Sequence, residues 1–176
     1  MPEFRAADGT RLAYDVSGKP ADPVLLLLPE DGQDRSTWKA VAAAFDDDHR
    51  VYCLDLRGHG EDGGEDVLAF LRALGVDRLG VIGHSPVAWR VAQAAPDLVD
   101  RLVIEDAVPP DPQAVPEIKA SVLVLSGGYE WAPGLREAAT ALPSSELVTI
   151  PVGHHIHRDA ESIFIKVVKA FLEATR

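Results

Sequence analysis

Short apolar runs alternate with amphipathic segments along most of this chain, and this alternation restricts its fold more than any other feature. The runs are rich in Leu, Val and Ile and cover Val24–Leu28, Val51–Leu56, Leu79–Ile82, Leu102–Ile104 and Val122–Leu125. Strands of a parallel sheet are buried on both faces, so they read as nearly continuous apolar runs. Parallel neighbours also need long crossover connections, which are usually helices. The pattern therefore predicts an α/β fold with helices on both faces of a parallel sheet.

The remaining segments extend this sheet to about eight strands. Asp8-Gly9 is a turn dipeptide, and the segments beside it, Phe4–Ala6 and Arg11–Val16, predict an antiparallel edge hairpin. A last strand is expected over Glu146–Ile150. Helices are expected over Thr37–Phe45 with Ser36 as its cap, Glu65–Leu74, Pro86–Ala95, Pro133–Leu142 and Ala160–Ala174. The proline-rich stretch Val108–Glu117 predicts an extended connection inside a single domain of residues 1–176.

Charge and composition exclude several classes of partner. Seventeen Lys and Arg against 28 Asp and Glu give a net charge of −11, which repels nucleic acid and anionic membranes. Apolar runs such as Val24–Leu28 fall far short of the roughly 20 residues that span a bilayer. Residues 1–7 lack the apolar core of a signal peptide, so a cytoplasmic location is expected. Cys53 is the only cysteine, which excludes an intrachain disulfide and a cysteine-rich zinc motif.

The strongest local motif is Gly83-His84-Ser85-Pro86-Val87, where a predicted strand runs into a predicted helix. A serine on such a tight turn exposes its hydroxyl beside the positive end of the helix, as a nucleophile requires. Later strands are followed by an acid, Glu130, and by a histidine, His154, which gives the order Ser, acid, His. The alternative is that Ser85 only caps the helix.

With these motifs in view, the chain resembles the α/β-hydrolases of the esterase, thioesterase and lactonase kind over nearly its whole length. The resemblance implies a twisted, mostly parallel sheet with Ser85 as nucleophile, His154 as general base and then acid, and Glu130 as the group that orients the histidine. Asp106 is the alternative acid, because some family members take theirs from the earlier strand. The resemblance implies a small-molecule substrate and no cofactor.

One departure from the family concerns the cover of the site. Family members usually carry a helical lid after the strand that ends at Asp106, but only 15 residues, Ala107–Ser121, precede the next strand here. This length leaves no room for a lid. We therefore expect a site that is open to water, unless a second subunit covers it in a homo-oligomer.

Further departures concern the oxyanion hole. Glu30 stands where the family usually has glycine, and Asp31 holds the position of a backbone donor, although a carboxylate there repels a developing oxyanion. Pro86 follows Ser85 and has no N–H to donate. Losing one such donor typically costs about 10²–10³ in turnover. Pro86 also favours an extended Ser85, and Val87 replaces the final glycine of the motif.

Other residues near these motifs have two interpretations. Tyr129 and Trp131 either line a substrate pocket or pack on the rim of the sheet. His154, His155 and His157 together suggest a metal site, with Glu30 or Asp31 as an oxygen ligand. Because three close histidines on one loop rarely converge on a single ion, no metal is predicted.

Three functions remain open at this point. The first is a serine hydrolase acting on an ester, thioester or lactone. The second is a non-hydrolytic acid–base enzyme, such as a lyase, dehydratase, isomerase or cyclase, that uses His154 with Glu130 or Asp31 and needs no oxyanion hole. The third is a ligand-binding protein without catalytic activity. A fold shared by many functions does not decide among them.

Overall fold

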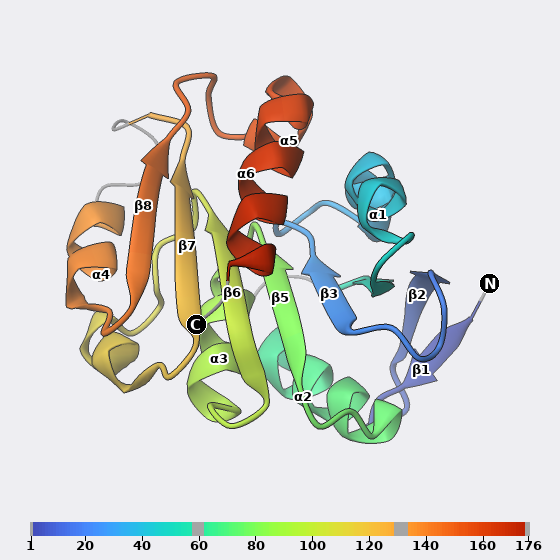
Figure 1. Cartoon of the computed structure of the whole chain (residues 1–176). Coiled ribbons are helices and arrows are strands. Elements are labelled where there is room, and N and C mark those ends of the chain that lie inside the picture. The colour runs from blue at the N-terminus through green and yellow to red at the C-terminus, as the bar shows by residue number, and fades with distance from the viewer. Residues whose placement is uncertain (1, 58–61, 129–133, 175–176) are drawn as a thin grey trace.

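The computed structural model describes residues 2–57, 62–128 and 134–174, and in them one sheet of eight strands (Figure 1). The spatial order is β1-β2-β4-β3-β5-β6-β7-β8. The strands are β1 (Glu3–Arg5), β2 (Arg11–Ser17), β3 (Val24–Leu28), β4 (Arg50–Leu54), β5 (Leu79–Gly83), β6 (Val99–Glu105), β7 (Ser121–Ser126) and β8 (Ser145–Thr149). β1 and β2 form the expected antiparallel hairpin, β2 pairs antiparallel with β4, and every pair from β4 to β8 is parallel. The predicted α/β class is confirmed.

Helices cover both faces of the sheet (Figure 1). One face carries α1 (Lys39–Phe45) and α6 (Glu161–Glu173), and the other carries α2 (Asp62–Leu74), α3 (Pro86–Ala94) and α4 (Leu135–Ala141). The central strand β3 contributes to both cores: Leu25 and Leu27 belong to one cluster, and Leu26 and Leu28 to the other. Burial on both faces is the reason that β3 is apolar at every position.

Two local predictions are wrong in detail. Asp34, not Ser36, caps the first helical turn, because Asp34 Oδ1 accepts the N–H of Ser36 at 2.8 Å and the chain enters α1 through a 3₁₀ turn, η1 (Arg35–Trp38). The segment expected to be extended contains a second 3₁₀ turn, η2 (Pro112–Glu117), with an aspartate as its cap. The predicted last helix, Ala160–Ala174, is confirmed to within one residue at each end as α6 (Glu161–Glu173), and a short helix that was not predicted, α5 (Ile156–Asp159), precedes it across the non-helical Ala160 (φ −138°).

The first turn of α3 lies unusually close to the end of β5. A Cβ built on Gly83 would lie 2.3 Å from the Cβ of Ala88, so only glycine fits at this position. The family motif places its small residue at position 87, yet Val87 is 5% exposed and packs in the core. The close approach of strand and helix is therefore met by Gly83 and Ala88 instead.

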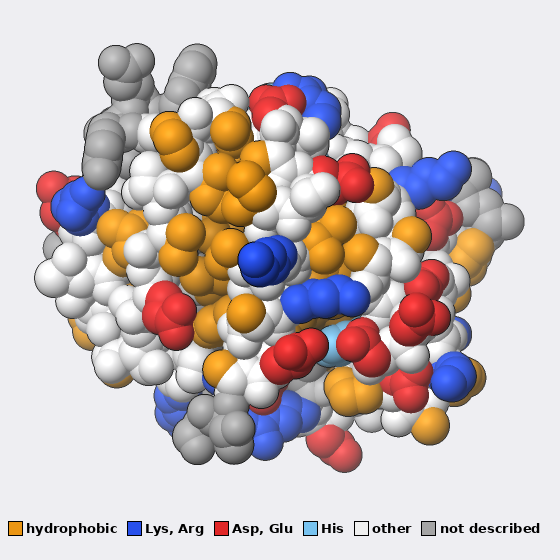
Figure 2. Space-filling model, turned by 45° about the horizontal axis from the view of Figure 1, so that its top comes forward, with side chains coloured by type: hydrophobic (Ala, Val, Ile, Leu, Met, Phe, Trp, Pro, Cys, Tyr) orange, Lys and Arg blue, Asp and Glu red, His pale blue; other side chains and the backbone are white. Residues whose placement is uncertain are grey.

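Charged side chains border exposed apolar ones on the face that Figure 2 shows. The large apolar residues most exposed are Val108, Val152 and Ile163. Val108 follows β6 and Val152 follows β8, so both belong to segments at the carboxyl ends of parallel strands.

None of the described helices combines the length and the apolar character needed to cross a membrane.

The strand order determines where a site forms. β3 lies between β4 and β5, so the chain adds β4 on one side of β3 and later adds β5 on its other side. In open α/β sheets ligands bind outside the carboxyl ends of the strands at such a switch point. Residues that follow β3, β5, β6, β7 and β8 meet at this edge, among them Glu30, His84, Asp106, Gly127 and His154.

Candidate active site

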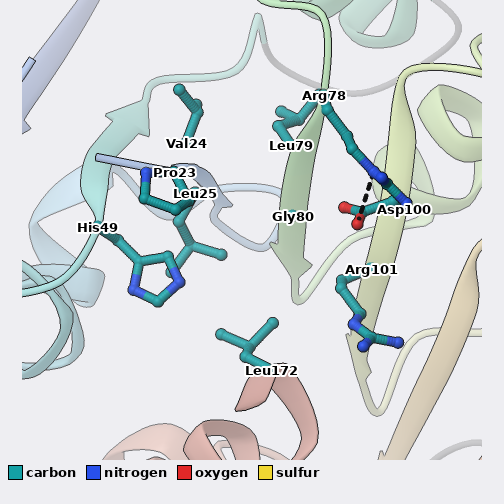
Figure 3. Close-up of a pocket in the computed structure, with 10 residues that line it drawn as sticks. All are labelled: Pro23, Val24, Leu25, His49, Arg78, Leu79, Gly80, Asp100, Arg101 and Leu172. Atoms are coloured by element: carbon teal, nitrogen blue, oxygen red, sulfur yellow. Dashed lines mark ion pairs between the residues drawn. The ribbon is translucent and has the colours of Figure 1, made fainter. Parts of the chain in front are cut away.

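A pocket at the opposite, amino end of the strands contains none of the residues that the sequence singled out (Figure 3). It is formed by the starts of β3, β5 and β6 together with Leu172 of α6. Its charged groups are paired within the protein: Arg78 Nε lies 2.9 Å from Asp100 Oδ2, and Arg101 donates to the carbonyl of Ala174. We therefore look for chemistry at the carboxyl edge of the sheet.

Ser85 lies at that edge but is held as a helix cap. Its side chain is fully buried, and its Oγ accepts the N–H of Val87 at 3.2 Å. Its backbone is extended (φ −152°, ψ 146°), as the following Pro86 favours. Among the described residues other than glycine, only Asp106 has a positive φ, so Ser85 does not adopt the strained turn of a nucleophile elbow. These contacts correspond to the capping role that the sequence left as the alternative.

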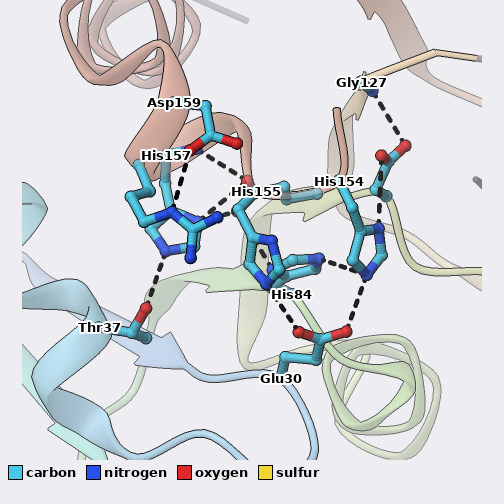
Figure 4. Close-up of polar contacts among 11 residues, drawn as sticks. Glu30, Thr37, His84, Gly127, His154, His155, His157 and Asp159 are labelled. Atoms are coloured by element: carbon cyan, nitrogen blue, oxygen red, sulfur yellow. Dashed lines mark hydrogen bonds and ion pairs between the residues drawn. The ribbon is translucent and has the colours of Figure 1, made fainter. Parts of the chain in front are cut away.

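His154 is the centre of a polar cluster instead (Figure 4). Its Nε2 lies 2.8 Å from Glu30 Oε1 and 3.1 Å from His84 Nε2. Its Nδ1 lies 3.5 Å from Asp106 Oδ2. In a serine hydrolase Nε2 is the atom that takes the proton of the nucleophile. Here that atom faces a carboxylate and a second imidazole.

The loop that carries His154 is fixed by a contact between two glycines. The N–H of Gly153 donates to the carbonyl of Gly127 at 3.1 Å. A Cβ on Gly127 would lie 1.8 Å from the carbonyl oxygen of Gly153, so no larger residue fits. Gly153 itself has a φ of +102°, which glycine adopts without strain. The segments after β7 and β8 are thereby brought together and His154 is aimed at the sheet edge.

Asp106 is the acid that lies beside His154, as the alternative assignment required. Its side chain is fully buried, and its Oδ1 accepts the N–H of Gly127 at 3.0 Å. Burial raises the pKa of this carboxyl, although the N–H of Gly127 and the nearby His154 act in the opposite direction. The other predicted acid, Glu130, and the neighbouring Tyr129 and Trp131 lie outside the described residues.

A second carboxylate, Glu105, lies beneath the cluster and was missed from the sequence. It is fully buried and accepts both the backbone N–H and the Nδ1–H of His157 at 2.8 Å. His157 Nε2 in turn lies 2.9 Å from Thr37 Oγ1. The available signal was a carboxylate directly after the apolar run Leu102–Ile104, to which the sequence analysis gave no role.

His84 lies between the partly exposed His154 and the buried Glu105. The sequence indicated only that His84 belongs to the motif around Ser85. Its side chain is 2% exposed, and its Nδ1 lies 3.9 Å from Glu105 Oε2. Burial lowers the pKa of His84 to about 2, with further contributions from His154, His157 and His155. The imidazole is therefore neutral near pH 7.

Glu30 occupies the solvent side of the cluster. Its second carboxylate oxygen, Oε2, lies 3.1 Å from His155 Nε2. The side chains of Glu30, His154 and His155 are 29%, 26% and 25% exposed, so a small molecule reaches this side of the cluster. Asp31, the other carboxylate of the predicted oxyanion region, is exposed on the turn that follows.

Comparison with known proteins identifies the family. The model of the family described as "alpha/beta hydrolase fold" matches residues 23–160. Human epoxide hydrolase 4 is 29% identical over 112 residues, which are 54% of this chain and 31% of that protein. The chain spans about a third of the length of the curated relatives it matches.

Solved structures show the same fold over almost the whole chain. A hydrolase from Pseudomonas aeruginosa superposes with a TM-score of 0.87 at 23% identity, covering 98% of both chains. The enol-lactonase from Burkholderia xenovorans superposes with a TM-score of 0.85 at 18% identity, covering 98% of this chain and 100% of the other. At these identities the likeness concerns the fold alone.

Proposed function

Because the chain belongs to the α/β-hydrolase family, we propose that it hydrolyses a small ester, thioester or lactone with a water molecule activated by His154, without an acyl-enzyme on Ser85. One observation carries this proposal. Nε2 of His154 faces Glu30 at 2.8 Å, whereas the hydroxyl of Ser85 is buried and accepts the N–H of Val87.

The reaction needs one proton transfer in each direction. A water molecule on the exposed side of His154 and Glu30 attacks the carbonyl carbon while Nε2 of His154, released from its contact with Glu30, takes one of its protons. The tetrahedral intermediate then expels the alcohol or thiol, and Nε2 returns the proton to that leaving group. A proton on Nδ1 faces Asp106, which keeps Nε2 available as the base and stabilises the imidazolium. Asp106 is thus a positioning residue, and His154 is the catalytic base.

The surroundings of the cluster favour a small and partly apolar substrate. Val108 and Val152 are each 38% exposed and follow the same strands as Asp106 and His154. They offer apolar contacts beside the polar cluster. Between Asp106 and β7 the only helical segment is the short η2, so this described stretch supplies little cover above the edge.

A second candidate is proton transfer without hydrolysis, as in a lyase or isomerase. The favouring observation is Pro86, which lacks the N–H that would stabilise an oxyanion. The same base, His154, would then remove a proton from carbon. This candidate predicts hydrogen exchange or isomerisation of a carbonyl substrate and no hydrolysis.

The test compares Ser85→Ala with His154→Gln on a panel of p-nitrophenyl esters, thioesters and lactones. We expect Ser85→Ala to keep kcat/KM within about threefold, and His154→Gln to lose about 10²–10⁴ because the general base is gone. Asp106→Asn should lower kcat more than it changes KM, since it acts through His154. Urea unfolding of each variant controls for the fold, because loss of the Ser85 cap costs about 1 kcal/mol of stability.

Labelling with a fluorophosphonate, read by intact mass, tests the covalent route directly. No adduct is expected on the wild type. An adduct that disappears in Ser85→Ala, together with loss of hydrolysis in that variant, would refute the proposal and support the serine mechanism. A folded protein that hydrolyses nothing on the panel would also refute it.

A further inference from the structure

Three potential metal-ligand atoms converge on the open side of the cluster: Nε2 of His84, Nε2 of His154 and Oε1 of Glu30. His154 Nδ1 faces Asp106 Oδ2 at 3.5 Å, and His84 Nδ1 faces Glu105 Oε2 at 3.9 Å. An ion bound by Nε2 of both rings would leave the ring protons on Nδ1, where each ring faces a carboxylate. Each Nε2 would then direct its lone pair at the ion. The two Nε2 atoms lie 3.1 Å apart, close enough to bind the same ion.

Glu30 adds a third ligand atom to this pair. Its Oε1 lies 2.8 Å from His154 Nε2, and the ligand atoms of Glu30, His84 and His154 all lie within 4.8 Å of one another. A cation at the centre would accept lone pairs from all three atoms. Two imidazoles whose far nitrogens face carboxylates, joined by one carboxylate ligand, form a typical ligand set for zinc and related ions.

We propose that Glu30, His84 and His154 bind one divalent transition-metal ion, of which Zn²⁺ fits best, with a fourth position open to solvent. This inference rests on the proposed function, since the ion would supply the activated water there in place of free His154. The ligands come from three places in the chain, after β3, β5 and β8. The sequence suggested His154 and Glu30 as ligands but grouped them with His155 and His157, and it did not point to His84.

The distances fit such an ion. Zn–N and Zn–O bonds of about 2.0–2.1 Å place tetrahedral ligand atoms about 3.3 Å apart. The observed separations of 3.1 Å between the two Nε2 atoms and 2.8 Å between Nε2 and Glu30 Oε1 are within about half an ångström of this. Glu30 is also held through its other oxygen, because His155 Nε2 lies 3.1 Å from Oε2. One carboxylate oxygen is thereby directed at the two imidazoles.

The deeper grouping of His84, Glu105 and His157 is a poorer site. All three residues are buried, and both Glu105 oxygens already accept hydrogen bonds from the backbone N–H or the ring of His157. His157 Nε2 contacts Thr37. We assign this grouping to the orientation of His84, as carboxylates behind metal-bound histidines commonly do.

The test measures metal binding without reference to activity. The full-length protein is stripped with a chelator, dialysed and titrated with ZnCl₂ by calorimetry, with stoichiometry from elemental analysis. Titration with CoCl₂ reports geometry, because tetrahedral Co²⁺ absorbs strongly in the visible range. We expect one ion per chain and a dissociation constant at least 100-fold weaker in Glu30→Gln and in His154→Gln. Both side chains are partly exposed, so these variants should fold.

Matched variants separate this site from binding by any histidine. His49→Gln removes a histidine paired with Asp48 away from the cluster and should change the dissociation constant less than threefold. Asp106→Asn removes only a carboxylate behind a ligand and should weaken binding about 10-fold. Absence of stoichiometric binding to the folded wild type would overturn the inference. Binding that is unchanged in both Glu30→Gln and His154→Gln would also overturn it.

Failure of this inference is distinguishable from failure of the proposed function. If zinc does not bind but Ser85→Ala remains active and His154→Gln does not, His154 alone activates water and only the metal inference fails. If zinc binds at Glu30 and His154 but hydrolysis depends on Ser85, the metal site stands and the water mechanism fails.

Discussion

Replacing Gly83 by alanine tests the close approach of strand β5 and helix α3 on which the site is built. The added Cβ would lie 2.3 Å from the Cβ of Ala88, more than 1 Å short of an ordinary contact. Neither atom belongs to a flexible side chain, so the helix or the strand must move. Overpacking of this kind costs about 1–3 kcal/mol, and alanine recovers about 0.5–1 kcal/mol of backbone entropy. Because a 2.3 Å separation places the cost at the upper end of that range, we expect a net loss of about 2 kcal/mol.

Urea unfolding followed by circular dichroism and tryptophan fluorescence measures this loss, and the melting temperature should fall by about 4–8 °C. Gly64→Ala in α2 is the matched control, because its Cβ would lie 3.6 Å from the Arg90 side chain, an ordinary contact. It should be neutral or slightly stabilising. In the double variant Gly83→Ala/Ala88→Gly the clash is removed, so the two changes should show a favourable coupling of about 1 kcal/mol or more. A loss below about 0.5 kcal/mol in Gly83→Ala, or no coupling in the double variant, would refute the reasoning.

Two further predictions concern titratable groups away from the site. Burial raises the pKa of the Cys53 thiol to about 12, so the folded thiol should react with a disulfide reagent at pH 8 far more slowly than in urea. Because this pKa is raised above its unfolded value of 9.0, the stabilisation is present below pH 9 and is lost as the pH rises toward 12. Cys53→Ala should therefore flatten the decline of the urea midpoint above pH 9, and an equally steep decline in that variant would contradict the assignment. Arg57 pairs with exposed Asp8 and, through two nitrogens, with buried Asp66. Arg57→Ala leaves the buried carboxylate of Asp66 without its ion pair, so it should lower the urea midpoint more than Asp8→Asn does. Equal effects of the two variants would show that Asp66 needs no partner.

The fold was largely predictable because its signals are local. The apolar run Val24–Leu28 predicted β3 with the same bounds, since a strand buried on both faces has no polar position. The hairpin at Asp8-Gly9 was predictable for the same reason, because turn chemistry acts over a few residues. Helix ends were less accurate, because an aspartate one or two positions earlier competes equally well as a cap.

The site was predictable only in part because its residues converge through strand order. His154 was found from its position after a glycine and the last strand, and Asp106 as the alternative acid. The contact of Glu30 with His154 depends on β3 lying next to β5 and on the loop after β8 bending back, which spacing along the chain does not encode. Glu105 was missed because it follows the apolar run Leu102–Ile104, and nothing in that run shows that a carboxylate at the next position is buried.

The departures from the family pattern form a consistent set. Pro86 removes an oxyanion donor and favours an extended Ser85, whose hydroxyl then caps α3. His154 therefore needs another partner for Nε2, since a polar atom left unpaired in a folded protein costs about 1–3 kcal/mol. Glu30 supplies that partner at 2.8 Å.

Loss of activity alone would not produce this arrangement. A site that had only lost its nucleophile would leave the remaining groups without compensating contacts. Here His84 and His154 each face a carboxylate behind them, and Glu30 is held between His154 and His155. Residues that depart from the usual pattern of a fold and yet pair with one another are typical of functional sites. We therefore interpret Glu30 and Pro86 as parts of one altered mechanism that removes the covalent serine route and builds a water-activating centre at the same strand ends.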